Sequence, residues 1–415
     1  MRNKRSFSFL IFSQVIMAAG FALSLPFIAI YLNAKRGMPM PLIGLFFSAS
    51  VFFASFSQIM GGEISDRIGR KKVMIFALVG RAVSVLCISF LTFVEGNVYF
   101  ILLAHMAGVF LGAFFAPAAD AWIADFTPSA ERVKAYGLMR IGINLGWAIG
   151  PAFGGMLAMK SYPKMFFITF LATVLCFLVI LFFVEDSDIA LRNTEHIAVK
   201  DVRLVLKNRK FIHFSIYVFF IAIVMSQLII SNSLYATDCL GFTEADVGIL
   251  FSINGVIVIS MQYTVVKMME RFRLSSALAL GSVFYGLGYF IFGYSIYFKL
   301  AVLAVSIFSL GEIIIAPGIQ TLAANLAPER HKGRFLGVMG LFRHTGHSAG
   351  ILIGTNAIYI LSPLFQAAPW YLIAFISSIA ALGFYRLGTK LSYTENGGRI
   401  RVLTPIENIK KPQTV

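Results

Sequence analysis

The chain has 415 residues, of which 58% are hydrophobic and 13% are charged, and its mean hydropathy is +0.82. This composition lies far outside the range of soluble globular proteins and excludes a large soluble domain. The formal net charge of +16 does not indicate nucleic-acid binding, because the Lys and Arg residues lie in short loops and tails beside apolar runs, where they set topology and meet anionic lipid. We therefore expect an integral membrane protein that contacts the lipid bilayer and no nucleic acid.

Apolar runs along the chain are long enough to cross the bilayer as helices of about 20 residues each. The first follows Arg2, Lys4 and Arg5 and is too long for a cleaved signal core. Because the number of spans is even, both termini lie on one side, and most Lys and Arg residues lie there too, so both termini are expected in the cytoplasm and the chain in the inner membrane of the cell. The predicted spans lie near residues 7–32, 41–64, 73–94, 98–122, 134–158, 163–184, 211–236, 245–268, 274–296, 299–324, 335–361 and 368–388.

One polar segment interrupts this pattern and divides the chain into two halves of six spans. The predicted units are a first bundle over 1–184, a cytoplasmic linker over 185–210, a second bundle over 211–390 and a cytoplasmic tail over 391–415. The halves also repeat at an offset of 200 positions. Six spans per half make the repeat parallel, about an axis normal to the membrane, so we expect an all-α fold of two six-helix bundles. The matched pairs are Ala116 with Ala316, Pro117 with Pro317, Pro128 with Pro328, Gly137 with Gly337, Gly146 with Gly346 and Gly150 with Gly350.

The turn between spans 2 and 3 combines glycine with mixed charge. Its sequence over residues 61–72 is GGEISDRIGRKK. Glycine permits a tight backbone where a span leaves the membrane and re-enters it, and an acid between helix ends can pair with a cation. This stretch resembles the G-x-x-x-D-R-x-G-R-K signature of the major facilitator superfamily, carried here by Gly62, Asp66, Arg67, Gly69, Arg70 and Lys71.

The resemblance implies an ion network at the end of span 4. In relatives of this type an acid at the position of Asp125 joins the Asp and Arg of the signature, which would link Asp125 with Asp66 and Arg70 in a conformational latch. The alternative for Asp125 is a solvated acid at a helix end.

Span 5 is rich in glycine at intervals of four residues. Such glycines line one face of a helix and let another backbone approach closely, while a proline permits a bend. The run resembles the G-x-x-x-G-P-x-x-G-G motif of the antiporter branch of the same superfamily, although a close-packing helix without that role is the alternative. The residues are Gly142, Gly146, Gly150, Pro151, Gly154 and Gly155.

Ionisable residues inside spans are costly and are functional candidates. Glu312 lies roughly 20 Å into span 10 by helical rise, so its side chain cannot reach either surface. We expect it to pair with Arg343 or with His347, either as a proton or substrate site or as a structural lock. The proton-coupling candidates are Glu312, Asp120 and His105, and Asp120 could alternatively extend the latch. The substrate-cavity candidates are Arg140, Asn144, Gln227, Asn232, Arg343 and His347.

These features together favour a secondary transporter that works by alternating access. The resemblance implies proton-coupled efflux of drugs or small amphipathic metabolites, with protons and a small-molecule substrate as partners and a monomeric carrier. The alternative is uptake or facilitated transport of a sugar, an organic acid or a siderophore, because span 4 carries His105 where drug exporters usually carry an arginine. No enzyme, cofactor or metal is expected, since the sequence shows neither a phosphate-binding loop nor metal-ligand spacing around Cys87, Cys176 or Cys239.

Overall fold

The computed structural model describes residues 4–128, 131–186, 205, 207–269, 271–328 and 332–397. Within these residues eleven helical segments are long and apolar enough to cross a membrane. The helix of residues 332–361 is the twelfth, and its several polar residues make it less apolar than the others. The chain is a multi-pass membrane protein, and the predicted twelve-helix fold is confirmed.

The first half comprises α1 (Lys4–Ile30) with the π-helical extension η1 (Tyr31–Lys35), α2 (Met40–Ile68), α3 (Arg70–Phe93), α4 (Val98–Gly112), α5 (Phe115–Phe126), α6 (Arg132–Lys160) and α7 (Tyr162–Phe183). The second half comprises α9 (Arg209–Met225), the short 3-10 turn η3 (Ser226–Leu228), α10 (Ile230–Asp238), α11 (Glu244–Met269), α12 (Leu274–Phe292), α13 (Phe298–Leu326), α14 (Lys332–Leu361), α15 (Ala368–Gly388) and α16 (Tyr393–Asn396). The predicted linker and tail lie mostly outside the described residues, so the division into four units remains a prediction.

Two predicted spans are interrupted, which corrects the expectation of continuous helices. Span 4 breaks between α4 and α5, and span 7 breaks at η3 between α9 and α10. In span 7 the Gln227 amide Nε2 donates to the carbonyl of Ile223 at 2.7 Å and to that of Gly350 on α14 at 2.8 Å. A side chain that bonds to backbone carbonyls in this way is a recognised cause of a helix break.

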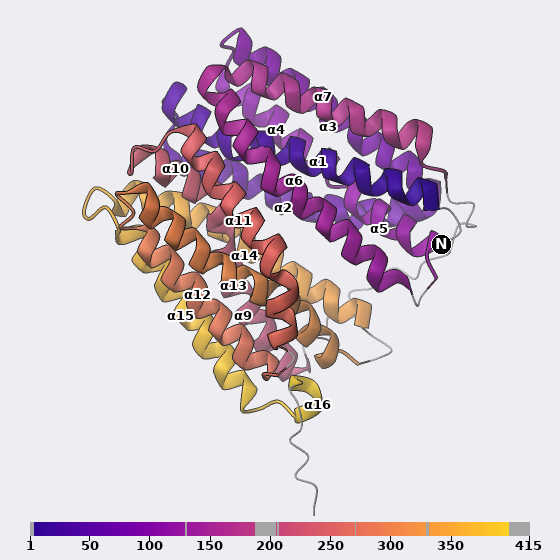
Figure 1. Cartoon of the computed structure of the whole chain (residues 1–415), viewed down its shortest axis with the longest axis vertical. Helices are drawn as coiled ribbons and strands as arrows, with labels where there is room; N and C mark the ends of the chain where they lie inside the picture. Colours follow the sequence, from indigo (N-terminus) through magenta and orange to yellow (C-terminus); the bar gives the residue numbers. More distant parts are fainter. Residues whose placement is uncertain are drawn as a thin grey trace, which may run out of the picture.

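The two bundles meet at one end and diverge at the other (Figure 1). At the end near α10, which we call the closed end, a methyl group added to Gly155 of α6 would overlap the Glu244 carbonyl of α11. On the other pair of helices, the Ser48 and Ser348 hydroxyls of α2 and α14 lie 2.9 Å apart. The opposite end, which carries the N-terminus and α16, is the open end. There a methyl group on Gly337 would meet no atom within 4 Å.

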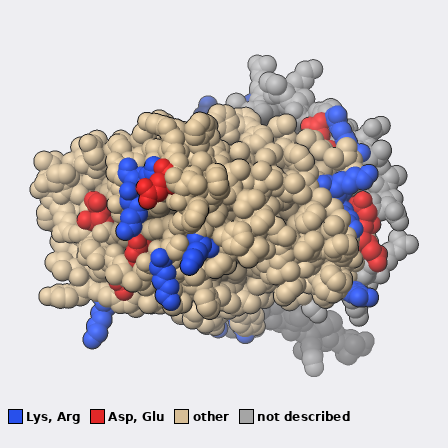
Figure 2. Space-filling model, turned by 90° about the horizontal axis from the view of Figure 1, so that it is seen from above, with Lys and Arg blue, Asp and Glu red and all other residues tan. Residues whose placement is uncertain are grey.

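The outer faces of the bundles are apolar, as contact with lipid requires. Figure 2 shows the Lys, Arg, Asp and Glu side chains of one face gathered toward its two ends, with a broad stretch of other residues between them. The exposed apolar side chains of α3 and α7 include Val79, Val83, Phe90, Leu171 and Leu175.

The short helix α16 fastens the second bundle at the open end. Glu395 accepts hydrogen bonds from Lys210, at the start of α9, at 2.9 Å, and its backbone carbonyl accepts one from Asn325 of α13. The next residue, Asn396, accepts from the backbone N–H of Ser275 of α12 at 2.8 Å. Partial burial acts to raise the pKa of Glu395, but the hydrogen bonds from Lys210 and Ser392 and the Lys210 charge lower it below its usual value.

Candidate functional site

The turn between α2 and α3 holds an ion triad within the first bundle. Arg70 at the start of α3 forms an ion pair with Asp66 near the end of α2, across the turn at Gly69, and its Nε lies 3.2 Å from Oδ2 of Asp125 on α5. All three side chains are mostly shielded from solvent, with exposed fractions of 13%, 20% and 13% respectively. Arg70 also donates to the Ser65 hydroxyl at 2.8 Å. The structure thus brings together the three predicted members of the latch.

Gly69 joins α2 to α3 with φ of +106°, a left-handed backbone conformation that side chains other than hydrogen rarely allow. The Asp186 carboxylate, which follows α7, lies at this turn and accepts the backbone N–H of Lys71 at 3.4 Å. Arg67 points outward instead, to an exposed ion pair with Glu63. Asp186 was not predicted, because the sequence alone does not place the end of span 6 beside this turn.

Gly62 is not the glycine of closest approach in this region. A methyl group on Gly61 would lie 2.9 Å from the Phe114 Cα at the break in span 4, whereas one on Gly62 would meet Pro117 only at 3.9 Å. The motif glycine therefore has room, and its neighbour sets the distance between spans 2 and 4.

The predicted small face of α6 packs against α1. Methyl groups on Gly146, Gly150 and Gly154 would overlap the backbone of α1, and one on Gly142 would lie 3.1 Å from Val15. These four glycines therefore act inside the first bundle.

Gly155 and Pro151 point the other way, across the interface to α11. The Pro151 carbonyl lies against Gly248, and the Cα of Ala148 would lie 2.6 Å from a methyl group on Gly255. The two helices thus offer small residues to each other at the closed end. The sequence prediction missed Gly248 and Gly255, since span 8 shows no dense glycine run.

A cavity of about 250 Å³ lies between the bundles near the middle of the membrane-spanning region. Its residues come from α6, the broken span 7, α11, α12, α13 and α14, and most of them are aromatic or aliphatic. They are Ile143, Asn144, Trp147, Met225, Leu228, Ile229, Phe251, Asn254, Gly255, Val258, Tyr285, Glu312 and His347.

Glu312 is the acid in the lining of this cavity. Its Oε2 accepts a hydrogen bond from the Asn254 amide at 3.0 Å, and that amide also donates to Ser309 at 2.9 Å. The cation that acts on Glu312 electrostatically is Arg140, which comes from the other bundle. Neither Asn254 nor Arg140 was predicted as its partner.

The expected pair of Glu312 with Arg343 or His347 is not formed in the described part of the chain. His347 lines the same cavity, but in the described part of the chain no hydrogen bond joins it to Glu312, whose Oε2 accepts from Asn254. Arg343 lies one turn away on α14, outside the cavity lining, beside His344 and His347. The physical reason is that Asn254, on the neighbouring helix α11, already donates a hydrogen bond to the carboxylate.

Of the six predicted cavity residues, Asn144 and His347 line the cavity, and Arg140, Gln227, Asn232 and Arg343 are not part of its lining. Gln227 is fully buried in the break of span 7, where it bonds to α14. Asn232 borders a small void inside the second bundle, walled by residues such as Phe292 and Phe308.

The two remaining proton-coupling candidates, Asp120 and His105, differ in their exposure to solvent. Asp120 is exposed, and the hydrogen bond at this residue joins its backbone carbonyl to the Tyr136 hydroxyl at 2.9 Å. It makes no ion pair with Arg70 among the described residues. His105 is buried inside the first bundle, where its ring lies 4.6 Å from that of Phe47.

Comparison with known proteins decides the class. The family model described as Major Facilitator Superfamily matches residues 10–351, which is most of the chain. The chain belongs to the major facilitator superfamily. It is therefore a transporter for a small-molecule substrate and not an enzyme.

Relatives of this superfamily member span nearly its full length. It is 26% identical over 369 residues to a Na(+), Li(+), K(+)/H(+) antiporter of Planococcus maritimus, covering 81% of this chain and 86% of that protein. It is 23% identical over 381 residues to the multidrug resistance protein MdtH of Yersinia enterocolitica, covering 91% and 93%. A crystal structure of a mutant nucleoside transporter, NupG, has the same fold, with a TM-score of 0.79, 14% identity and coverage of 92% and 99%.

Within the described residues, this transporter has no group of three His, Cys, Asp or Glu side chains that could hold a metal ion.

Proposed function

We propose that this transporter exports drugs or small amphipathic metabolites in exchange for protons, by alternating access. One observation carries the proposal. Glu312 is a single carboxylate on the wall of an otherwise largely apolar cavity at the interface of the bundles, with Asn254 as its hydrogen-bond donor and the charge of Arg140, from the other bundle, acting on it. A carboxylate in this position can exchange a proton for a substrate as the bundles move.

The exchange would follow from competition for Glu312. When Glu312 is ionised, the Asn254 amide of its own bundle and the Arg140 charge of the other bundle stabilise it. When it is protonated, the attraction between Glu312 and Arg140 is lost, and the two bundles are free to separate on that side. A substrate that needs the ionised carboxylate and a proton therefore occupy the site in turn, which is the requirement for antiport.

The cavity walls favour an amphipathic substrate. Trp147, Phe251 and Tyr285 provide aromatic surface, and Met225 provides a flexible apolar side chain that adapts to different shapes. Few polar groups fix the orientation of a ligand, so shape and apolar area would dominate selection. MdtH, a relative of similar length, is named for multidrug resistance, which fits this substrate class.

The latch and the interface would control the two states. If both termini are cytoplasmic, as the distribution of Lys and Arg indicates, the open end faces the cytoplasm of a cell whose inner membrane holds the chain. In the opposite state the last turn of α2, with Asp66, would approach the first turns of α14, where Gly337 now faces open space. The positive N-terminal end of α14 would attract that acid. A single chain contains every part of this cycle, so we propose that it works as a monomer.

Proteoliposomes with an imposed pH gradient test this proposal. The parent protein should concentrate a fluorescent amphipathic cation against its gradient, and Glu312→Gln should abolish that accumulation while still allowing downhill equilibration. The amide keeps the size and hydrogen bonding of the side chain but cannot carry a proton. Glu95→Gln is the matched control because it also removes one carboxylate, from an exposed loop residue at the closed end, and it should still respond to the gradient.

Two results would contradict the proposal. If Glu312→Gln accumulates substrate as the parent does, coupling does not pass through this residue. If the parent ignores the pH gradient, the transporter is not proton-coupled, and uptake or facilitated transport of a small metabolite takes its place. That second result would agree with the absence of an arginine in span 4.

A further inference from the structure

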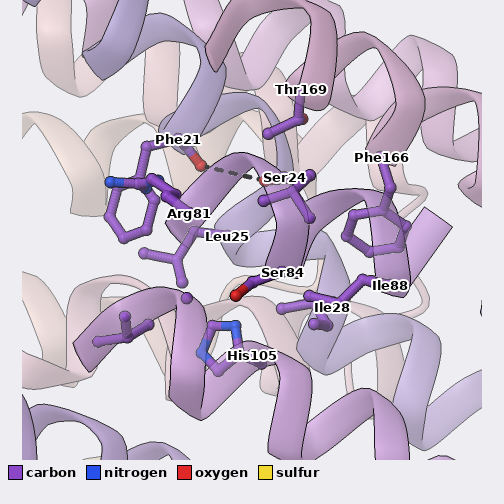
Figure 3. Close-up of a pocket in the computed structure, with 13 residues that line it drawn as sticks. Phe21, Ser24, Leu25, Ile28, Arg81, Ser84, Ile88, His105, Phe166 and Thr169 are labelled. Atoms are coloured by element: carbon purple, nitrogen blue, oxygen red, sulfur yellow. Dashed lines mark hydrogen bonds between the residues drawn. The ribbon is translucent and has the colours of Figure 1, made fainter. Parts of the chain in front are cut away.

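A second pocket lies inside the first bundle, away from the cavity between the bundles. It has a volume of about 30 Å³ and is enclosed by α1, α3, α4 and α7. Figure 3 shows Arg81 beside Phe21 at one side of the pocket and His105 entering from another, with Leu25 between them in this view. Neither the proposed efflux mechanism nor the latch uses Arg81.

Arg81 is a charged group deep within the membrane-spanning region. It lies in the middle of α3, roughly 17 Å from the start of that helix by helical rise. Its guanidinium carbon lies 4.2 Å from the centroid of the Phe21 ring. A methyl group on Gly112 would come within 3.4 Å of its Nη1, so the end of α4 confines the guanidinium from the other side.

The charge of Arg81 has no carboxylate partner in the described part of the chain. The described ion pairs involve Arg67, Arg70 and Lys210, and the other titratable groups that interact with Arg81 are Cys176 and His105. A guanidinium has five N–H donors and stays protonated in proteins. An aromatic face offsets part of its lost hydration but accepts none of the conventional hydrogen bonds.

His105 supplies a second polar group to the same pocket. Its side chain is only 8% exposed, and its Nε2 has no hydrogen-bond partner within the described residues. A buried ring nitrogen without a partner is costly, so a ligand that accepts a hydrogen bond from Nε2–H would remove that cost. The same small pocket is thus lined by a positive charge without a carboxylate partner, on Arg81, and by a ring nitrogen without a hydrogen-bond partner, on His105.

We propose that this pocket binds a small monovalent inorganic anion of the size of chloride, held by the Arg81 guanidinium and by Nε2–H of His105. Water would accept hydrogen bonds but would leave the buried positive charge uncompensated, whereas an anion satisfies both groups. The volume holds a monatomic ion and excludes a drug, a sugar or a large organic acid.

The position of the anion links it to the rest of the transporter. The Phe21 ring that covers Arg81 also meets the indole of Trp147, at 6.1 Å between centroids in an edge-to-face arrangement, and Trp147 lines the central cavity. Arg81 also lies against the end of α4, where span 4 breaks. A bound anion would therefore stabilise the packing of α1, α3 and α4 without touching the substrate.

Equilibrium binding of radioactive chloride to the purified full-length protein in detergent tests the site, independently of any transport activity. Protein exchanged into gluconate buffer should bind chloride saturably, and gluconate should not compete because it is too large for the pocket. Removing a charged hydrogen-bond donor costs about 1.5–3 kcal/mol, so Arg81→Gln should weaken binding by about tenfold or more. His105→Phe should weaken it less.

Arg140→Gln is the matched control, because it removes an arginine from the central region of the membrane-spanning helices without altering this pocket, and it should bind chloride like the parent. Thermal unfolding of the parent should also shift upward with chloride concentration, since a ligand that binds only the folded state stabilises it. This shift keeps the test valid if Arg81→Gln does not fold.

Absence of saturable chloride binding by the parent overturns the proposal, and so does unchanged binding by Arg81→Gln. Loss of binding in Arg140→Gln with retention in Arg81→Gln would move the anion to the central cavity and would also overturn it. Binding of formate in the absence of chloride binding would assign the pocket to a carboxylate in place of an inorganic ion.

Discussion

Two adjacent glycines of α6 allow the effect of packing within a bundle to be tested separately from the effect of contact between the bundles. Gly154 faces α1 in the same bundle, and Gly155 faces Glu244 and Ala245 of α11 in the other. An alanine at either position adds the same methyl group. The expected consequences differ, because the first contact exists in every state of the transporter and the second only while the closed end is closed.

The size of the effect follows from the contacts. A methyl group on Gly155 would overlap the Glu244 carbonyl and would lie 2.9 Å from the Ala245 Cα, where ordinary contacts begin at 3.4 Å. The helices must therefore separate by roughly 1 Å, and overpacking of this kind costs about 1–3 kcal/mol. If the cost falls only on the closed state, the ratio of the two states shifts by about 5- to 150-fold toward opening of the closed end.

Electron-spin distance measurements check this shift. Spin labels at Glu95→Cys and Leu364→Cys, which lie on loops of different bundles at the closed end, should report a larger population of long distances in Gly155→Ala than in the parent. Gly154→Ala is the matched control and should lower thermal stability while leaving the distance distribution unchanged. A distribution for Gly155→Ala that matches the parent, or a shift in Gly154→Ala instead, would refute the reasoning.

Further expectations concern the latch, the α16 fastening and the break in span 7. Asp66→Asn should cripple transport while leaving membrane insertion intact, because it removes one acid from the Arg70 triad; wild-type transport rates in liposomes would contradict this. The pKa of Glu395 is lowered in the folded protein, so its contribution to stability is present above the ordinary Glu pKa of about 4.3 and is lost as pH falls through the lowered value. Thermal unfolding of Glu395→Gln should therefore lose part of the parent's pH dependence in that acidic range, and identical pH profiles would argue against the ion pair. Gln227→Leu should lower thermal stability by about 1–3 kcal/mol, because two carbonyls lose a buried donor, and an unchanged unfolding temperature would show that the break does not depend on this amide.

The twelve spans follow from the sequence for a simple physical reason, whereas the ion triad was implied by the resemblance of the turn between spans 2 and 3 to the superfamily signature. The length of an apolar run is almost enough to predict a span. A segment in lipid must pair all of its backbone N–H and C=O groups internally, so a run of about 20 apolar residues forms a helix. Asp66 and Arg70 lie on either side of the turn at Gly69, and Asp125 ends a span on the same side, so their meeting requires only that spans 2 and 4 be neighbours.

The cavity contacts could not be predicted in the same way. The partner of Glu312 depends on the rotation of α11 and α13 about their axes, and hydropathy carries no information on rotation when every face is apolar. The sequence therefore contained nothing to show that the partners of Glu312 are Asn254 and Arg140, and not Arg343 or His347. The break in span 7 was missed for a related reason, because it comes from the Gln227 amide and not from proline or glycine.

The small-residue contact between α6 and α11 also has a consequence for the response of the transporter to salt. At the closed end the described residues seal the bundles with close backbone approaches, and with neutral or singly charged hydrogen bonds such as that from the Tyr162 hydroxyl to Glu244 at 2.7 Å. No ion pair crosses this end in the described part of the chain. Screening by dissolved ions weakens attraction between opposite charges but hardly affects van der Waals contact. The opening of this seal, taken by itself, should therefore be nearly independent of ionic strength, so the salt dependence of the transport cycle should arise from the charges of the central cavity and the open end.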